Sequence, residues 1–202
     1  MYIFLDIETR QDDNLVHIKK DNLKVPATYK DPEKIKAWIE NKDIRKDMSV
    51  DPDYCELICI GVKPEGQHPR LMSLEEFGLY VDGFIASDNT VTFVTFNGKK
   101  FDFPAIMKLG LRNNIDLPYK ELKALTARYN NHGLMQHIDL MEELGEYGQW
   151  KSLDQYLQIY LGISKKEIDF STASIEEIKE HCLEDLINTD KLFNKFKPIV
   201  AK

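Results

Sequence analysis

Cysteine is scarce in this sequence. Only three occur among 202 residues, at positions 55, 59 and 182, and they form neither a CxxC pair nor a histidine spacing typical of zinc. We therefore expect them to be reduced core residues. No stretch reaches the length of a membrane span, and the N-terminal MYIFLDIET lacks the basic start of a signal peptide. These absences predict a cytoplasmic protein that does not act at a membrane.

An excess of basic residues is also missing, because the formal net charge is -7. This charge argues against a protein that coats nucleic acid non-specifically, although an active site built from carboxylates contributes to it before metals bind. The apolar share of 43% and the chain length are ordinary for a globular protein. We therefore expect residues 1–202 to form a single domain.

The chain does contain two acids inside an apolar run. The segment YIFLDI reads as a strand buried on both faces, yet it carries Asp6 and is followed by Glu8. Residues two apart on a strand project to the same face, so the two carboxylates lie side by side at its end. In a partly dry environment they repel each other unless a cation lies between them. The pair therefore predicts a metal site.

Local patterns along the chain predict the other elements, without internal repeats or low-complexity segments. Residues 10–30 are polar and lack periodicity, which indicates a long surface excursion. Apolar runs predict strands, and capping patterns predict helices. The expected strands are 54–62, 70–74, 90–97 and the start of 137–144; the expected helices are 31–46, 75–87, the segment from Pro104 to 114, 152–162 and 175–197, the last ending before Pro198. This order predicts an α/β fold with a mixed sheet covered by helices on both faces.

Further acids lie at the ends of other predicted elements. Asp102 follows a strand and precedes the helix at Pro104, where it serves either as a metal ligand or as a helix N-cap. In the last helix, His181 and Asp185 are four residues apart and share one face, which fits either a site or an ordinary surface pair.

Three segments in order, LDIET, FNGKKFDFP and HCLED, are similar to the three exonuclease motifs of the DEDD superfamily of 3′-5′ exonucleases. The chain most resembles the predicted exonucleases related to the proofreading domain of family-B DNA polymerases. The resemblance extends through HIDLMEEL, SLDQYLQIYLGISKK and CLEDLINTDKLF, and so covers nearly the whole chain. It implies a ribonuclease H-like fold and hydrolysis of phosphodiester bonds from a 3′ end.

The resemblance also implies the cofactor and its ligands. Two divalent ions about 3.5 to 4 Å apart can hold the attacking and leaving oxygens of a phosphodiester. Mg²⁺, or Mn²⁺ in its place, prefers hard oxygen ligands. By the resemblance, Asp6 bridges both ions, Glu8 holds the ion nearer the nucleophile, and Asp102 and Asp185 complete the ligand sets.

His181 is the expected general base for the attacking water. Its spacing departs from the family pattern, in which either a His lies five residues before the last Asp or a Tyr lies four before it. This chain has a His at the Tyr spacing. The alternative is a helix-face residue bonded to Glu184, Asp185 or a carbonyl.

Asn97 and Phe101 match positions that contact the terminal nucleotide in relatives, and Thr9 lies where the backbone after the DxE pair approaches the 3′ end. Stacking on an aromatic ring and a grip on phosphate would hold a single-stranded end without reading its sequence. Phe101 fits the core equally well, and Asp139 and His137 fit structural roles. The lysines at 99, 100, 165 and 166 are either phosphate contacts or a solvated charged surface.

The expected partner is nucleic acid, as single-stranded DNA 3′ ends, with replication or repair proteins as further partners by analogy. Two rival interpretations stay open. The same scaffold can carry an RNA-directed exonuclease or a structure-specific endonuclease, or a nucleic-acid-binding module that has lost catalysis. Retention of all four mutually repelling acids argues against the inactive module.

Overall fold

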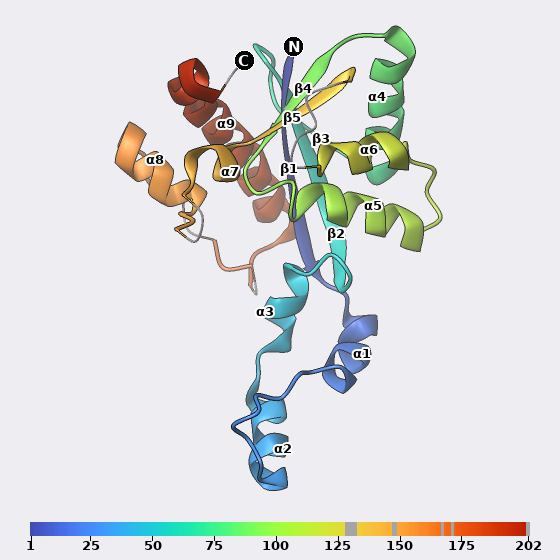
Figure 1. Ribbon diagram of the computed structural model, residues 1–202, viewed down its shortest axis with the longest axis vertical. Coiled ribbons are helices and arrows are strands. Elements are labelled where there is room, and N and C mark those ends of the chain that lie inside the picture. Colours follow the sequence, from blue (N-terminus) through green and yellow to red (C-terminus); the bar gives the residue numbers. More distant parts are fainter. Residues whose placement is uncertain (128–132, 147–148, 167, 171, 201–202) are drawn as a thin grey trace.

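A mixed five-stranded sheet forms the centre of the protein (Figure 1). The computed structural model describes residues 1–127, 133–146, 149–166, 168–170 and 172–200. The strand order is β3-β2-β1-β4-β5, with β1 antiparallel to β2 and parallel to β4. The strands are β1 (Tyr2–Gln11), β2 (Cys55–Pro64), β3 (Arg70–Met72), β4 (Val91–Thr95) and β5 (Met135–Asp139). The fold is α/β and ribonuclease H-like, as the sequence predicts.

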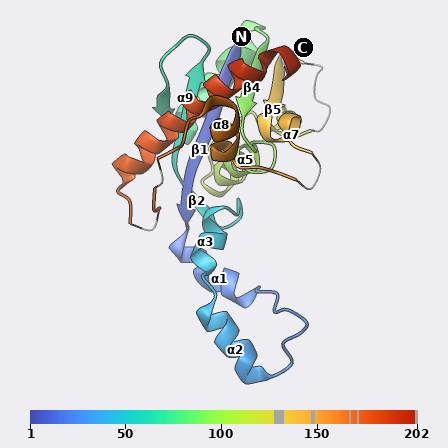
Figure 2. The same cartoon turned by 90° about the vertical axis from the view of Figure 1, so that its left-hand side faces the viewer.

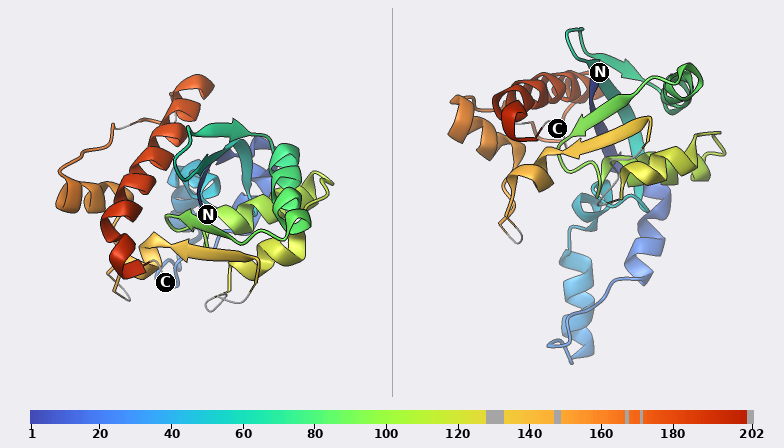
Figure 3. Two further views of the ribbon diagram at one scale, coloured as in Figure 1. Left: turned by 90° about the horizontal axis from the view of Figure 1, so that it is seen from above. Right: turned by 45° about the horizontal axis from the view of Figure 1, so that its top comes forward.

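Helices cover both faces of this sheet, as the view from above shows (Figure 3). One face carries α4 (Leu74–Ser87), α5 (Asp102–Arg112) and α6 (Tyr119–Leu125). The other carries α7 (Leu140–Leu144), α8 (Leu153–Leu161) and α9 (Ile175–Val200). Within the described ranges, none of the helices is both long enough and apolar enough to pass through a membrane.

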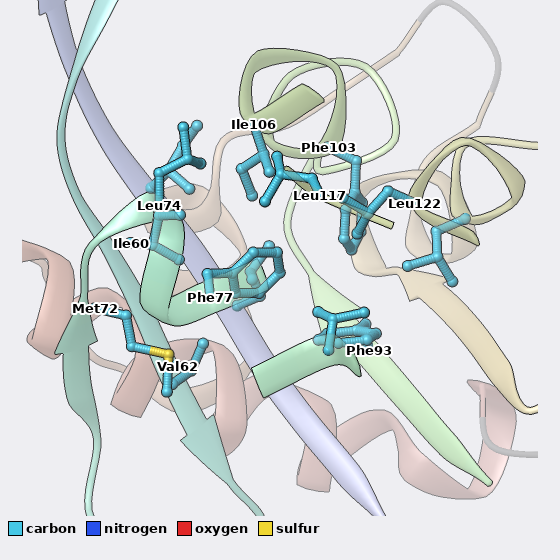
Figure 4. Close-up of a cluster of buried hydrophobic side chains, with 14 of the residues drawn as sticks. Ile60, Val62, Met72, Leu74, Phe77, Phe93, Phe103, Ile106, Leu117 and Leu122 are labelled. Carbon is cyan, nitrogen blue, oxygen red and sulfur yellow. The ribbon is translucent and has the colours of Figure 1, made fainter. Parts of the chain in front are cut away.

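The alternation of β1 divides its side chains between two cores. Ile3, Leu5 and Ile7 face the core under α4, α5 and α6, which Figure 4 shows in close-up. Phe4 points to the opposite face, where it packs edge-on against Phe193 of α9 at 5.6 Å between ring centroids. Because side chains alternate along a strand, Asp6 and Glu8 follow Phe4 onto the α9 face.

Between β1 and β2 the chain leaves the sheet and protrudes from the body (Figures 1 and 2). We call residues 12–51 the arm. It contains the 3-10 helix η1 (Asp13–Leu15) and helices α1 (Val16–Asp21), α2 (Pro32–Asn41) and α3 (Ile44–Ser49). The expected surface excursion is present, but the predicted single helix over 31–46 is wrong. It breaks because the Asp43 side chain accepts a hydrogen bond from Lys46 N–H and starts a new helix.

Two further helix boundaries differ from the sequence-based expectation. Helix α5 begins at Asp102 rather than near Pro104, and Asp102 makes no side-chain cap; its N-cap interpretation is therefore wrong. Helix α9 continues through Pro198 to Val200. A proline in the last turn removes one hydrogen bond only, and the buried Val200 keeps this turn packed on the body.

A buried histidine ties three elements together next to the sheet edge. His137 Nε2 lies 2.8 Å from Thr95 Oγ1, and its Nδ1 lies 2.8 Å from the Leu125 carbonyl oxygen. The Phe103 ring packs against it at 4.8 Å between ring centroids. Burial lowers the pKa of His137 from 6.5 to about 3. The structural role expected for His137 is consistent with these contacts.

This histidine predicts an acid-sensitive component of stability. The folded protein binds no proton at His137 between pH 6.5 and about 3, whereas the unfolded chain does. The free energy of unfolding should therefore fall, as the pH drops through this window, by about 1.4 kcal/mol per pH unit from this group. Urea unfolding of wild type and His137→Gln at several pH values isolates the effect, with exposed His17→Gln as the control. Parallel pH profiles for wild type and His137→Gln would contradict the assignment.

Candidate metal centre

Acidic side chains from three elements meet at one end of the sheet. Asp6 and Glu8 come from β1, and Asp185 comes from α9, which packs on the same face. Two groups of potential metal ligands occur among the described residues: one joins Asp6, Glu8 and Cys182, and the other joins Glu8, His181 and Asp185. Within each group the ligand atoms lie within 4.8 Å of one another. Glu8 belongs to both groups and so connects the strand to the helix.

A glycine on β2 allows α9 to come this close. Gly61 is paired with Asp6 in the β1–β2 ladder. A Cβ atom at position 61 would lie 2.7 Å from Cys182 Sγ and 2.7 Å from Leu186 Cδ1. Real Cβ contacts are not that short, so a larger residue at position 61 would force the Cys182 and Leu186 side chains to shift. The close packing of these two α9 side chains on β2 therefore depends on the absence of a side chain at Gly61.

Asp102 approaches the same end of the sheet from the opposite side. It is the first residue of α5 and is only 4% exposed. It belongs to neither ligand group among the described residues, but its charge interacts with that of Asp6. Burial, together with the negative charges of Asp6 and Asp139, raises the pKa of Asp102 well above its usual value.

The ionised forms of Asp6 and Glu8, the two acids of β1, are strongly disfavoured. Burial and the nearby negative charge of Asp185 raise the pKa of Asp6 to about 7. Burial and the charges of Asp6 and Asp185 raise the pKa of Glu8 to about 10. Desolvation and like charge act in the same direction here, and a bound cation would reverse both effects. This electrostatic arrangement is typical of a metal site.

One lysine partly compensates the negative charge. Lys165 Nζ donates a hydrogen bond to Asp185 Oδ2 at 2.5 Å. The other oxygen, Asp185 Oδ1, is buried and has no hydrogen-bond partner. A buried carboxylate oxygen without a donor is costly unless a cation binds it. The residues present therefore fit divalent cations, because the donors are hard oxygens and one of them is unpaired.

His181 lies one helical turn before Asp185, as its spacing predicts. Its Nε2 is 3.7 Å from Asp185 Oδ2, and the Phe170 ring packs edge-on against its imidazole. Burial lowers the pKa of His181, an effect that the charge of Asp185 opposes. The outer side of the ring borders a cavity of about 260 Å³ that contains acidic side chains of α9 and Lys166.

The three predicted substrate contacts occupy different environments. Thr9 Oγ1 donates a 2.6 Å hydrogen bond to the Ser49 carbonyl, and so connects β1 to the base of the arm. Asn97 lies in the turn after β4 with a left-handed φ of 72°. Phe101 is half-buried and packs against the core under α5. The structure brings none of these three into the two ligand groups.

Asp139 holds the turn that precedes Asp102. Its carboxylate accepts hydrogen bonds from the backbone N–H groups of Asn97 at 2.8 Å, Lys99 at 3.0 Å and Met141 at 3.1 Å. Burial raises its pKa, and these donors oppose the rise. A carboxylate occupied by three backbone donors is consistent with the structural role expected for this residue.

Sequence reasoning did not anticipate the positions of Lys165 and Cys182. Lys165 was expected either to contact phosphate or to be solvated, whereas the structure pairs it with Asp185. The three cysteines are free and buried as expected, but Cys182 also lies beside Asp6 and Glu8. The only feature of the sequence that pointed to the site for Cys182 was its position directly after His181 in the HCLED segment.

A solved family B DNA polymerase shares the fold of this chain. The family B DNA polymerase from the hyperthermophilic archaeon Pyrobaculum calidifontis matches with a TM-score of 0.58 and 14% identity, over 98% of this chain and 24% of the polymerase. A product-bound exonuclease I matches with a TM-score of 0.42 and 11% identity, over 98% of this chain and 43% of that protein. The chain thus spans about a quarter of the polymerase and less than half of exonuclease I.

The comparison with curated proteins finds no match. A family model does match residues 80–202, more than half of the chain, and it describes a predicted 3′-5′ exonuclease related to the exonuclease domain of PolB. This segment includes Asp102, His181 and Asp185, so it contains two of the three acidic motifs. The chain therefore belongs to this family of predicted 3′-5′ exonucleases.

Proposed function

We propose that residues 1–202 form one catalytic domain that removes nucleotides from the 3′ end of single-stranded DNA with two divalent ions, Mg²⁺ or Mn²⁺. The observation that carries this proposal is the carboxylate cluster of half-buried Asp6 with buried Glu8 and Asp185, together with the unpaired oxygen Asp185 Oδ1. The family match supports an exonuclease, and the choice of DNA and of single strands follows from the resemblance.

The four acids are proposed to hold the cations. Asp6 is central to this set, because its charge interacts with the charges of Glu8, Asp102 and Asp185. This central position supports Asp6 as a residue that would help to hold both cations, together with Glu8, Asp102 and Asp185. Divalent ions, when bound, supply the positive charge that stabilises the attacking and leaving oxygens of the phosphodiester.

The chain's own residues then position the water and move its proton. His181 is proposed to accept the proton of the attacking water at Nε2, the ring nitrogen that lies 3.7 Å from Asp185 Oδ2. The Asp185 side chain lies beside the imidazole, and the buried surroundings of Glu8 and Asp102 limit the water around the reacting phosphate. Lys165 would continue to neutralise part of the charge of Asp185 through Oδ2, while the unpaired Oδ1 would be available to a cation.

The metal assignment predicts a selective loss of cation binding. Mn²⁺ at 100 times its Kd should stabilise the wild type by about 2.7 kcal/mol, which corresponds to a rise in Tm of roughly 5 to 10 °C for this chain length. Asp185→Asn should lose more than half of this rise, because the amide is a weaker cation ligand. The matched control is Asp190→Asn on the same helix, whose carboxylate pairs with Lys63 outside the cluster. Equal Mn²⁺ shifts in all three proteins would exclude Asp185 as a ligand.

The direction of attack is tested with a 5′-labelled single strand of DNA. A 3′-5′ exonuclease should give a descending ladder of labelled products with Mg²⁺ or Mn²⁺ and none with EDTA. A 3′-phosphate should slow the reaction, and Asp6→Asn should abolish it, which controls for contaminating nucleases. An RNA strand of the same sequence measures the preference between substrates. Release of a labelled mononucleotide from the 5′ end, or cutting of a closed circle, would exclude the proposal.

The base assignment predicts a loss of turnover without a loss of metal. His181→Ala should lower kcat by roughly 10²- to 10⁴-fold, the usual contribution of a positioned proton acceptor. The Mn²⁺-induced rise in Tm should persist, because His181 is not assigned as a ligand. His181→Tyr recreates the Tyr spacing of the family and should retain more activity than the alanine variant, while exposed His68→Ala should behave as wild type.

Two outcomes would remove His181 from this role. An alanine variant within a few-fold of wild type would place His181 among ordinary residues of the helix surface. Loss of the Mn²⁺ shift together with activity would instead make it a metal ligand.

A further inference from the structure

The arm carries apolar residues but buries none of them near its tip. Among the described side chains between residues 12 and 43, none is buried. The same stretch nevertheless contains nine large apolar or aromatic residues: Leu15, Val16, Ile18, Leu23, Val25, Tyr29, Ile35, Trp38 and Ile39. In Figures 1 and 2, α2 and the chain around it extend away from both cores. Of the nine, Ile18 and Tyr29 are exposed and the other seven are half-buried. Apolar residues that no core buries are candidates for contact with a binding partner.

Two aromatic rings lie together at this tip. The centroids of Tyr29 and Trp38 are 6.2 Å apart, and their planes are tilted by 43°. Tyr29 is 39% exposed and Trp38 is half-buried. Lys42 Nζ lies 5.4 Å from the centroid of the Trp38 ring. Exposed rings next to ammonium groups are suited to a ligand that offers both flat π-faces and negative charge.

The outer part of the arm has a charge opposite in sign to that of the whole chain, whereas the arm as a whole, residues 12–51, contains nine basic and nine acidic residues. Between residues 16 and 42 there are seven lysines and four acids, whereas the chain has a net charge of -7. Lys24, Lys30, Lys34 and Lys36 are all exposed. One of the four acids, Asp31, is occupied as the N-cap of α2, where its side chain accepts a hydrogen bond from Glu33 N–H. Positive charge therefore gathers on the part of the molecule that protrudes.

The base of the arm is fixed to the strand that carries the candidate metal ligands. Glu8 is followed by Thr9, whose hydroxyl bonds to the Ser49 carbonyl at the end of α3. Ile44 and Met48 of α3 are buried against the body. From Glu8 to the end of β1 at Gln11 the chain advances only about 10 Å. A nucleic-acid strand whose 3′ end lies at the carboxylates of Asp6 and Glu8 therefore has the base of the arm next to it.

We propose that the arm tip, residues 22–42, binds single-stranded nucleic acid beyond the bond being hydrolysed. Bases stack on Tyr29 and Trp38, and the phosphates contact the four exposed lysines. This inference rests on the proposed function for the identity of its ligand. A protein partner fits less well, because lysine is depleted in the cores of protein interfaces, whereas lysines mixed with aromatic rings suit single strands. The arm lies outside residues 80–202, so the family match does not assign it a role.

Binding is measured by fluorescence anisotropy with labelled dT24 and dT6, on the full chain in EDTA so that hydrolysis cannot occur. Trp38→Ala should weaken dT24 binding by roughly 5- to 150-fold, the usual effect of removing one stacking residue. Lys34→Glu/Lys36→Glu should also weaken it and should flatten its salt dependence. The matched control is Lys120→Glu/Lys123→Glu, two exposed lysines of α6 with the same change in charge. The control should bind as wild type, and dT6 should be much less affected than dT24.

A second readout reports stacking directly. Trp38 and Trp150 are the two tryptophans of the chain, so Trp150→Phe leaves Trp38 as the fluorophore. Addition of dT24 should quench its emission. Trp38→Phe keeps an aromatic ring and should restore most of the affinity lost in Trp38→Ala, which a merely unfolded arm would not do.

The outcomes separate this inference from the proposed function. Arm variants that bind dT24 like wild type, or a wild type that binds no dT24, would overturn the inference; the second result would direct the search to a protein partner. Hydrolysis of the p-nitrophenyl ester of thymidine 5′-monophosphate with Mn²⁺ tests the catalytic site without the arm. If the chain does not hydrolyse this ester but still binds dT24 through the arm, the proposed function fails and the binding surface stands. If the chain hydrolyses the ester but does not bind dT24 through the arm, the inference about the arm fails and the proposed function stands.

Discussion

Repulsion between buried carboxylates is the constraint on which the site depends. Asp6, Glu8 and Asp185 are brought together by three separate features: the alternation of β1, the packing of α9 on the same face, and the missing side chain at Gly61. Without a cation this arrangement costs free energy, which is visible in the raised pKa values of Asp6 and Glu8. The rest of the fold must hold the acids together against this cost, and both cores contribute to that.

The two cores fix the site from opposite sides of the sheet. The core under α5 places Asp102 at the edge where β4 ends, and Asp139 holds the intervening turn through three backbone N–H groups. The other core anchors α9 through Leu186, Leu192 and Phe193, so that the helix cannot retreat from Asp6. Protonation or a bound cation therefore relieves the repulsion, since the acids cannot separate without disrupting packed side chains.

Local signals made much of this fold predictable from the sequence. The strand β1, the capping boxes at Ser73 and Ser152, and the pairing of Asp6 with Glu8 depend on residues only a few positions apart. Three acids in sequence order, joined to a family resemblance, were enough to nominate the site. The failures have tertiary causes: Asp102 is held by burial rather than by a cap, α9 passes Pro198 because Val200 packs on the body, and Lys165 reaches Asp185 from a loop. No local pattern encodes such contacts.

The distribution of charge raises a problem that the arm can resolve. A cluster of acids on a protein of net charge -7 repels a polyanionic strand, except at the few oxygens that bound cations would contact. Attraction over longer distances must come from elsewhere on the chain. The arm follows directly after β1, the strand that carries Asp6 and Glu8, and protrudes from the body (Figure 2), with Lys24, Lys30, Lys34 and Lys36 exposed. The surface that would attract the nucleic acid is thus separate from the site that would cut it. The first can therefore be positively charged and the second negatively charged.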